Sequence, residues 1–177
     1  LAARLGSIDS FDRRGEVVLA ESFGLDAAGW LFGGGVAGVV VEYSLITSYH
    51  GSFSIHIFVP AAAATFGYIA RYVVYPTLTR YGLEAAVNFP NFFQEIIWRI
   101  GIIVGSNEYD FQVRWRDTDN TLAYMNDSSG FTTFASNVDL EHIAGLFHIG
   151  KLVVDLSLGQ YVRFILNEKS YSLAGIP

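Results

Sequence analysis

The chain has 177 residues, of which 51% are hydrophobic and 16% charged, and its formal net charge at pH 7 is −6. This composition favours a folded chain with a large core over a disordered one. The acidic balance argues against a nucleic-acid partner, which usually meets a basic stripe, and against an anionic membrane surface. Cysteine is absent, which excludes a disulfide framework and a zinc ribbon.

We expect residues 1–177 to form a single domain, because this length suits one sandwich. The chain begins with Leu1 rather than Met, which is compatible with a fragment of a longer protein. The longest apolar stretch, WLFGGGVAGVVV at residues 30–41, is shorter than the ~20 residues of a membrane-spanning helix. We therefore expect no membrane span and interpret this stretch as a glycine-rich loop followed by a buried strand.

Alternation of apolar and polar residues, with turn signals between the runs, predicts strands along the first half of the chain. The predicted strands are residues 16–23, 52–59, 64–75 and 82–89. Pro60, Pro76 and Pro90 follow the last three of these runs. Proline ends a strand or confines it to an edge, because it has no N–H to donate.

The clearest alternation in the second half is EYDFQVRWR at residues 108–116, which places Tyr109, Phe111, Val113 and Trp115 on one face. Residues 92–105 fit either a helix or a strand, and their isoleucine and tryptophan content favours a strand. Residues 138–147 fit a short helix or a loop. Further strands are predicted at residues 121–126 and 131–136, in a hairpin at residues 151–167, and at residues 170–176.

About ten strands with hairpin-length links and no internal repeat leave two solutions, which are two packed antiparallel sheets or a closed barrel. Two segments carry a family resemblance that bears on this choice. ESFGLDAAGW at residues 21–30 is a strand followed by a loop that closes on Gly-Trp. FHIGKLVVDLSLGQYVRFILNEKSYSL at residues 147–173 has a strand, a tight tip, a strand ending in Asn, a short turn and a Tyr-bearing strand.

Together these segments resemble the concanavalin A-like lectin/glucanase superfamily in its laminin G-like form. GLEAAVNF at residues 82–89 also sits where such folds place a central strand that carries an acid. The resemblance implies an all-β fold, a two-sheet antiparallel jelly-roll sandwich. It also implies that a curved face or the loop tips could hold a glycan, as in many relatives.

Strand parity selects the candidate binding residues. Residues 108–116 place Glu108 and four further polar side chains on one face, and KLVVDLSLGQYVRFILN at residues 151–167 sets one charge into each of its apolar runs. If these strands are neighbours, their polar sides form one patch with a tyrosine, as sugar sites often do. The patch consists of Glu84, Asp110, Gln112, Arg114, Asp155, Tyr161 and Arg163. The alternative is a solvated face with cross-strand ion pairs, each worth about 0.2–1 kcal/mol.

EYDFQ at residues 108–112 resembles the catalytic strand of laminarinase-type glycosidases of the same superfamily, which carries Glu, Asp and Glu at alternate positions. Here the three positions are Glu108, Asp110 and Gln112. An amide cannot exchange a proton as the retaining mechanism requires, so hydrolysis is the less favoured interpretation. We expect no catalytic residues.

DTDN at residues 117–120 is a candidate calcium loop, with Asp117, Asp119 and the later Asp127 as oxygen ligands. Its spacing does not match an EF-hand, and Asp and Asn are also ordinary hairpin-tip residues. The four histidines show no metal-ligand spacing. Apart from possible Ca²⁺, we expect no cofactor.

We therefore expect a non-catalytic carbohydrate-binding or adhesion module with a glycan as its partner. A structural or assembly domain of a larger surface, capsid or tail protein remains the alternative, and a glycoside hydrolase a remote one. High apolar content with few charges favours a homo-oligomer or larger assembly. An extracellular or surface location is weakly favoured.

Overall fold

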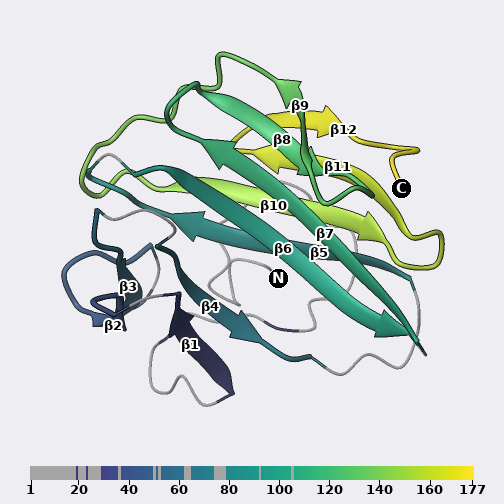
Figure 1. The fold of residues 1–177 in the computed structure, drawn as a ribbon. Coiled ribbons are helices and arrows are strands. Elements are labelled where there is room, and N and C mark those ends of the chain that lie inside the picture. The colour runs from purple at the N-terminus through teal and green to yellow at the C-terminus, as the bar shows by residue number, and fades with distance from the viewer. Residues whose placement is uncertain are drawn as a thin grey trace. The chain divides into compact units, whose positions relative to one another are not determined.

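The computed structural model describes residues 19, 23, 29–35, 37–49, 51, 53–61, 65–73, 79–91, 93–104 and 106–177. The chain divides into two compact units, Leu1–Val74 and Tyr75–Pro177. Every regular element among the described residues is a strand (Figure 1). No helix long and apolar enough to cross a bilayer occurs in this described part. The single domain predicted for residues 1–177 stays a prediction.

The first unit consists of two antiparallel strand pairs. β1 (Trp30–Gly34) pairs with β4 (Gly67–Arg71), and β2 (Val40–Ser44) pairs with β3 (Ser54–Phe58). The glycines of the predicted loop have a steric role, because a Cβ at Gly33 would lie 2.6 Å from the ring of Tyr68. Tyr68 of β4 thus lies against Gly33. Residues 30–34 of the glycine-rich stretch are a strand paired with β4 rather than the predicted loop.

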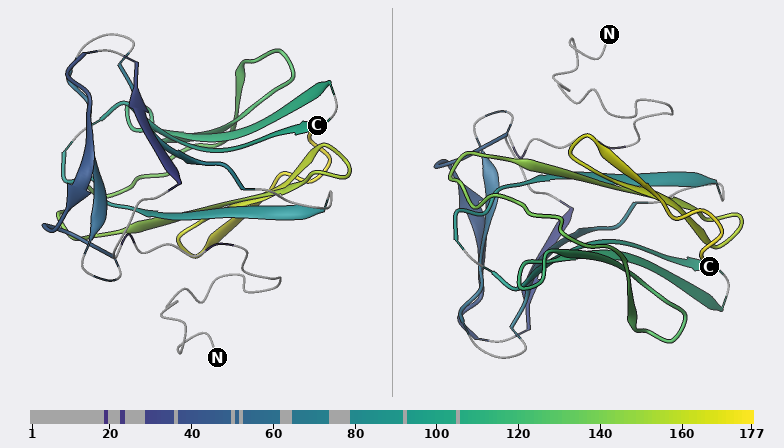
Figure 2. Two further views of the ribbon diagram at one scale, coloured as in Figure 1. Left: turned by 90° about the horizontal axis from the view of Figure 1, so that it is seen from below. Right: turned by 90° about the horizontal axis from the view of Figure 1, so that it is seen from above.

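The second unit contains two four-stranded antiparallel sheets. One has the order β12-β11-β10-β5 and the other the order β6-β7-β8-β9. Figure 2 shows the two sheets edge-on as separate layers. The strand bounds are β5 (Arg80–Val87), β6 (Glu95–Val104), β7 (Asn107–Arg116), β8 (Thr121–Met125), β9 (Phe131–Ala135), β10 (His148–Asp155), β11 (Gln160–Leu166) and β12 (Lys169–Ser172).

The core of the second unit lies between these sheets and follows their alternation. β7 contributes Phe111, Val113 and Trp115, which are 3%, 0% and 0% exposed. Leu152 and Phe164 face them from the other sheet, and each is 0% exposed. The Trp115 indole N–H donates to the carbonyl of Val138 at 2.7 Å, so the buried polar atom of this ring is satisfied.

The predicted all-β antiparallel two-sheet sandwich is confirmed. The ambiguous residues 92–105 contain strand β6, and residues 138–147 contain turns rather than a helix. The predicted strands at residues 52–59 and 64–75 are shorter than expected, since β3 and β4 have five residues each. Apart from Leu19 and Phe23, the strand predicted at residues 16–23 lies outside the described residues.

Candidate functional site

The outward face of β7 carries three of the predicted site residues, Asp110, Gln112 and Arg114. Their inward neighbours Phe111 and Val113 are buried, so alternation fixes the polar side chains on the solvent side. In the sheet register, β6 places Gly101 opposite Asp110, Arg99 opposite Gln112 and Ile97 opposite Arg114. The parity prediction for residues 108–116 is therefore confirmed.

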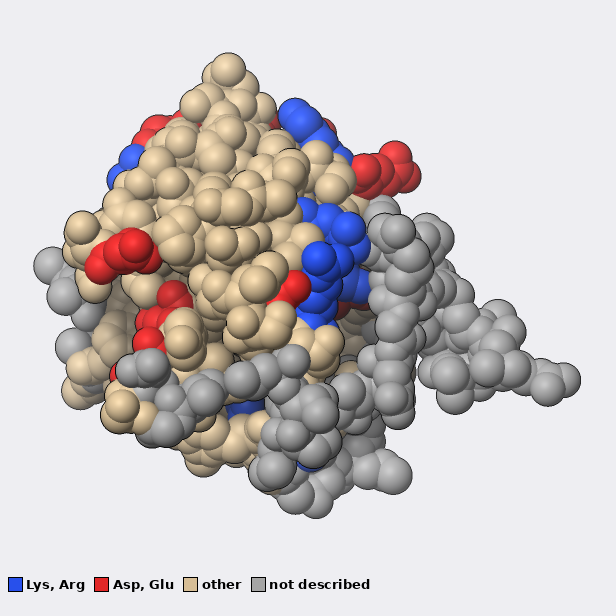
Figure 3. Space-filling view, turned by 90° about the vertical axis from the view of Figure 1, so that its right-hand side faces the viewer, with Lys and Arg blue, Asp and Glu red and all other residues tan. Residues whose placement is uncertain are grey.

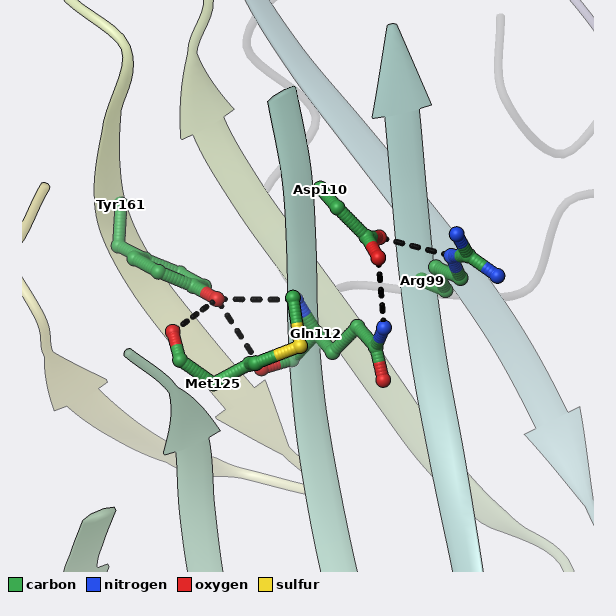
Figure 4. Close-up of polar contacts among 5 residues, drawn as sticks. All are labelled: Arg99, Asp110, Gln112, Met125 and Tyr161. Atoms are coloured by element: carbon green, nitrogen blue, oxygen red, sulfur yellow. Dashed lines mark hydrogen bonds and ion pairs between the residues drawn. The ribbon is translucent and has the colours of Figure 1, made fainter. Parts of the chain in front are cut away.

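Asp110 is the centre of a polar network on this face (Figure 4). One carboxylate oxygen accepts a hydrogen bond from Nε of Arg99 at 2.7 Å, and the other accepts one from Nε2 of Gln112 at 2.8 Å. Arg99 comes from the neighbouring strand, and the sequence analysis did not select it. Its spacing of four residues from Glu95, on the same face of β6, is the signal that could have identified it.

Arg114 contacts side chains on two other strands of its sheet, β6 and β9. Its Nη1 lies 3.4 Å from Oε2 of Glu95 on β6, and its guanidinium carbon lies 4.0 Å from the ring centroid of Phe131 on β9. Ala123 lies opposite Arg114 on the intervening strand β8 and is only 1% exposed. Phe131 is thus an aromatic side chain on the polar face that the sequence analysis missed. The guanidinium of Arg114 covers it by a cation–π contact.

Tyr161 does not lie on the polar face, which corrects the expectation that it shares a face with Arg163. On β11, Arg163 pairs with Val153, but Tyr161 pairs with Val154, so Val162 is an extra residue without a partner in β10. This bulge shifts the alternation by one residue. Tyr161 consequently points into the core, where it is 2% exposed.

The hydroxyl of Tyr161 binds the backbone of the opposite sheet. It accepts a hydrogen bond from the Gln112 N–H at 2.9 Å and lies 3.0 Å and 3.2 Å from the carbonyls of Met125 and Gln112 (Figure 4). The last pair of the β7–β8 register is Val113 with Tyr124, so Gln112 and Met125 lie just beyond its end. The hydroxyl therefore satisfies backbone groups where these strands separate. Burial raises the pKa of Tyr161 to about 12.

The remaining predicted residues, Glu84, Asp155 and Arg163, lie on the outward face of the other sheet. Glu84 pairs with Lys151 in the register, and Nζ of Lys151 lies 3.3 Å from its carboxylate. Because the two sheets pack through their inward faces, the outward faces that carry these three residues and Asp110 are on opposite sides of the sandwich. The seven predicted residues thus do not form one patch.

Asp155 is a hairpin residue. Its Oδ1 accepts hydrogen bonds from the Ser157 hydroxyl and from the Ser157 and Leu158 N–H groups, and its Oδ2 accepts one from Nε of Arg80 at 2.9 Å. These bonds fix the turn between β10 and β11. The Ser157 hydroxyl and the Arg80 guanidinium lower the pKa of Asp155.

The candidate calcium ligands fall at two different hairpin tips. Asp117 and Asp119 lie between β7 and β8, whereas Asp127 lies between β8 and β9. The five residues of β8 separate these tips by about 15 Å. The hydrogen bond from Arg116, supported by Thr121, lowers the pKa of Asp119 to about 2, and Asp117 lies 3.0 Å from His142 Nε2.

Within the described residues, no group of three or more His, Asp or Glu side chains could hold a metal ion. Calcium at the tip of residues 117–120 stays a prediction. The described part of the face drawn in Figure 3 is mostly uncharged, and several of its basic side chains lie next to acidic ones.

The network around Asp110 can position hydrogen-bonding groups, but it lacks the second free carboxylate of a glycosidase. Both Asp110 oxygens are bonded, and the third position of the motif is the amide of Gln112. Glu108, at the exposed end of the face, has no partner among the described residues that would bring it into the network. Asp110 is thus held as a hydrogen-bond acceptor for Arg99 and Gln112.

No family model matches the chain, and neither the curated proteins nor the solved structures contain a significant match. The resemblance to the concanavalin A-like superfamily therefore stays a prediction, and the family of this chain is not assigned.

Proposed function

We propose that this chain is a non-catalytic assembly domain, which joins other protein chains through the apolar surface of its first unit. One observation carries the proposal. No described residue from 29 to 73 is buried, although many are large and apolar. The most exposed of them are Ile46, Tyr72, Leu45, Phe66 and Phe58, at 93%, 86%, 72%, 56% and 51%.

The charge of this segment supports a protein partner. Between residues 29 and 73, Glu42 and Arg71 are the only Asp, Glu, Lys or Arg residues in the sequence. Large apolar side chains without a charged fringe are typical of surfaces that are covered in an assembly. Two-stranded sheets are also marginally stable in water alone, so covering β1–β4 and β2–β3 would stabilise them.

Light scattering of the purified chain over a concentration series tests the proposal. We expect assemblies larger than a monomer, which become smaller in a Leu45→Ser/Ile46→Ser variant. At concentrations where both proteins are monomeric, their melting temperatures should agree, because both side chains are exposed. The matched control is Leu158→Ser, since Leu158 is 65% exposed on a hairpin tip of the second unit. A monomeric wild-type chain at all concentrations would refute the proposal.

Glycan binding on the outward face of β6–β9 is the second candidate, and one specific observation favours it. Arg99, Asp110 and Gln112 form a chain of hydrogen bonds on adjacent strands, which leaves the side-chain amide oxygen of Gln112 and the terminal nitrogens of Arg99 for a ligand. Rigid strands that present alternating donors and acceptors suit the paired hydroxyls of a sugar.

A glycan array followed by calorimetry with Gln112→Ala tests this second candidate. The Gln112 backbone bonds to Tyr161, so truncating only the side chain leaves that contact in place. We expect loss of sugar binding in this variant and unchanged binding in Arg163→Ala, on the other sheet. Absence of any sugar binding at millimolar concentration would exclude the candidate.

A further inference from the structure

Among the described residues, the long edge strand β6 has no second neighbour in its sheet. β6 is the end strand of the order β6-β7-β8-β9 and pairs with β7 over ten consecutive positions without a register shift. Its sequence, EIIWRIGIIV, contains neither Pro nor Lys. A long, regular and apolar edge of this kind presents unpaired backbone groups to which another strand can add.

Two of the other three edge strands of the second unit carry features that discourage pairing and are absent from β6. β9 has five residues and a register shift opposite Leu122 and Ala123. β12 has four residues and begins with Lys169. β5 has eight residues and carries Arg80 and Glu84 at the same spacing as the two charges of β6, but Gly82 lies midway between them, so a pair centred there would lack a side-chain contact at its centre. Short length, bulges and charges are the usual means by which proteins protect sheet edges, and β6 has only the last of these.

The two charges on β6 are placed so that, in an antiparallel pair, they would attract the charges of a second β6 rather than repel them. Glu95 and Arg99 lie on the same outward face, two positions on either side of Ile97. In an antiparallel pair of identical strands centred on Ile97, Glu95 of each copy lies opposite the partner subunit's Arg99. No other centre within β6 gives this match, because 95 and 99 are equidistant only from 97.

Both charged side chains have room for a further partner. The side chains of Arg99 and Glu95 are 58% and 35% exposed. Only Nε of Arg99 is used by Asp110, and the two terminal nitrogens lie on the far side of the guanidinium from that carboxylate (Figure 4). Ile97, which is 42% exposed, would meet the partner subunit's Ile97 at the centre.

We propose that β6 is a homodimerisation edge, which pairs antiparallel with β6 of a second copy about a two-fold axis at Ile97. The two sheets then join into one eight-stranded sheet, and the polar network continues from Gln112 through Asp110 and Arg99 to the partner subunit's Glu95. This inference names a partner and a surface within the assembly function proposed above, on which it rests, and it uses a surface separate from residues 29–73.

A charge-exchange experiment tests the pairing on the whole chain. Arg99→Glu places two acids opposite each other at both ends of the symmetric pair, and Glu95→Arg places two bases there. We expect each variant alone to dimerise at least about tenfold more weakly than wild type by analytical ultracentrifugation. An equimolar mixture of the two variants restores complementary pairs at both positions, so it should form a heterodimer.

The control is Glu108→Arg, an exposed charge on the same sheet face but on β7, which should leave dimerisation unchanged. Melting temperatures check that each variant is folded, and the mixture remains informative if single variants are less stable. Failure of the mixture to associate more strongly than either variant would overturn the inference. So would protection from hydrogen exchange, in a monomer, of those alternate β6 amides that do not bond to β7, since a strand of the same chain would then cover the edge.

The two proposals fail separately. If Leu45→Ser/Ile46→Ser reduces assembly while Arg99→Glu does not, the β6 inference is lost and the assembly function stands. If only the β6 variants reduce assembly, the first unit is not the joining surface.

Discussion

The hydroxyl of Tyr161 lies 2.9 Å from the backbone nitrogen of Gln112, and it thereby links the two sheets at the position where β7 and β8 separate. Gln112 has a separate contact on each side of its sheet. Its backbone binds a core tyrosine, and its side chain binds Asp110 on the outward face. Gln112 thus contacts the core through its backbone and the polar face through its side chain.

Replacing Tyr161 by Phe should lower the free energy of unfolding by about 1–3 kcal/mol, because backbone groups of Gln112 and Met125 lose a buried partner. Urea denaturation measures this change. Tyr171→Phe is the matched control: Tyr171 is half-buried, and its hydroxyl makes no hydrogen bond that the described residues record. Equal losses in both variants would contradict the structural role of the Tyr161 hydroxyl.

The raised pKa of Tyr161 predicts that the folded state loses stability at alkaline pH. Burial raises its pKa from 10.0 to about 12, so the unfolded chain releases the proton at lower pH than the folded chain. This contribution is complete below pH 10 and is lost as the pH rises to about 12, with a limit of about 3 kcal/mol. Chemical denaturation at several pH values should show the stability difference between wild type and Tyr161→Phe shrinking across this range. A constant difference would exclude the linkage.

Gly150 should not tolerate a side chain. An added Cβ would lie 2.3 Å from Cε2 of Trp98, a ring that is 2% exposed and packs on Phe164 at a centroid distance of 5.1 Å. Gly150→Ala should therefore destabilise the fold by about 1–3 kcal/mol through overpacking. Gly101→Ala is the control, because a Cβ there meets nothing within 4 Å. Equal melting temperatures in the two variants would show that the two sheets can move apart to accommodate the added methyl group at no cost in stability.

Asp155 should make stability depend on acid pH. Its pKa is lowered mainly by the Ser157 hydroxyl and then by Arg80, so its contribution is present above the unfolded value of 3.8. The contribution is lost as the pH falls from there through the lower folded value. Denaturation of Asp155→Asn should show the difference from wild type to be largest near neutral pH and to shrink in acid. Ser157→Ala should give a smaller effect of the same sign, and an opposite sign in either variant would refute this assignment.

Chelation should leave the melting temperature unchanged. Asp119 already binds Arg116 and Thr121, so calcium would have to displace these contacts. Differential scanning fluorimetry with calcium and then with EGTA makes the comparison, because a bound ion stabilises the folded state by mass action. A drop in EGTA that is absent in Asp119→Asn would establish calcium at this tip.

The sequence was most informative where one strand could be interpreted alone. Alternation in residues 108–116 assigns Phe111, Val113 and Trp115 to the core and the polar residues between them to the surface, because both faces are marked by residue type. It could not show that Glu84 and Asp155 lie on a different sheet from Asp110. That distinction depends on β5 pairing with β10, across more than sixty residues of chain, and local pattern carries no information on such pairing.

The prediction for Tyr161 was wrong for a different reason. Its segment contains no glycine or proline at the bulge, and Tyr161, Val162 and Arg163 read as regular alternation. A tyrosine also occurs both in cores, where its hydroxyl has a hydrogen-bond partner, and on sugar-binding surfaces, so its residue type does not distinguish the two. Only the partner strand reveals that Val162 is an extra residue.

Because of this extra residue, the contacts of the C-terminal segment depend on the number of residues in β11. The Val162 carbonyl accepts a hydrogen bond from the Leu173 N–H at 3.1 Å, and the Tyr161 N–H donates to the Ile176 carbonyl at 2.9 Å, so the C-terminal segment is fitted to the bulge. Deleting Val162 would remove the bulge and leave Tyr161 opposite Val154, still facing the core, but it would also remove the carbonyl that accepts from Leu173. A one-residue deletion here therefore costs one of the two backbone bonds that hold the C-terminal segment, whereas a substitution of Val162 leaves both in place.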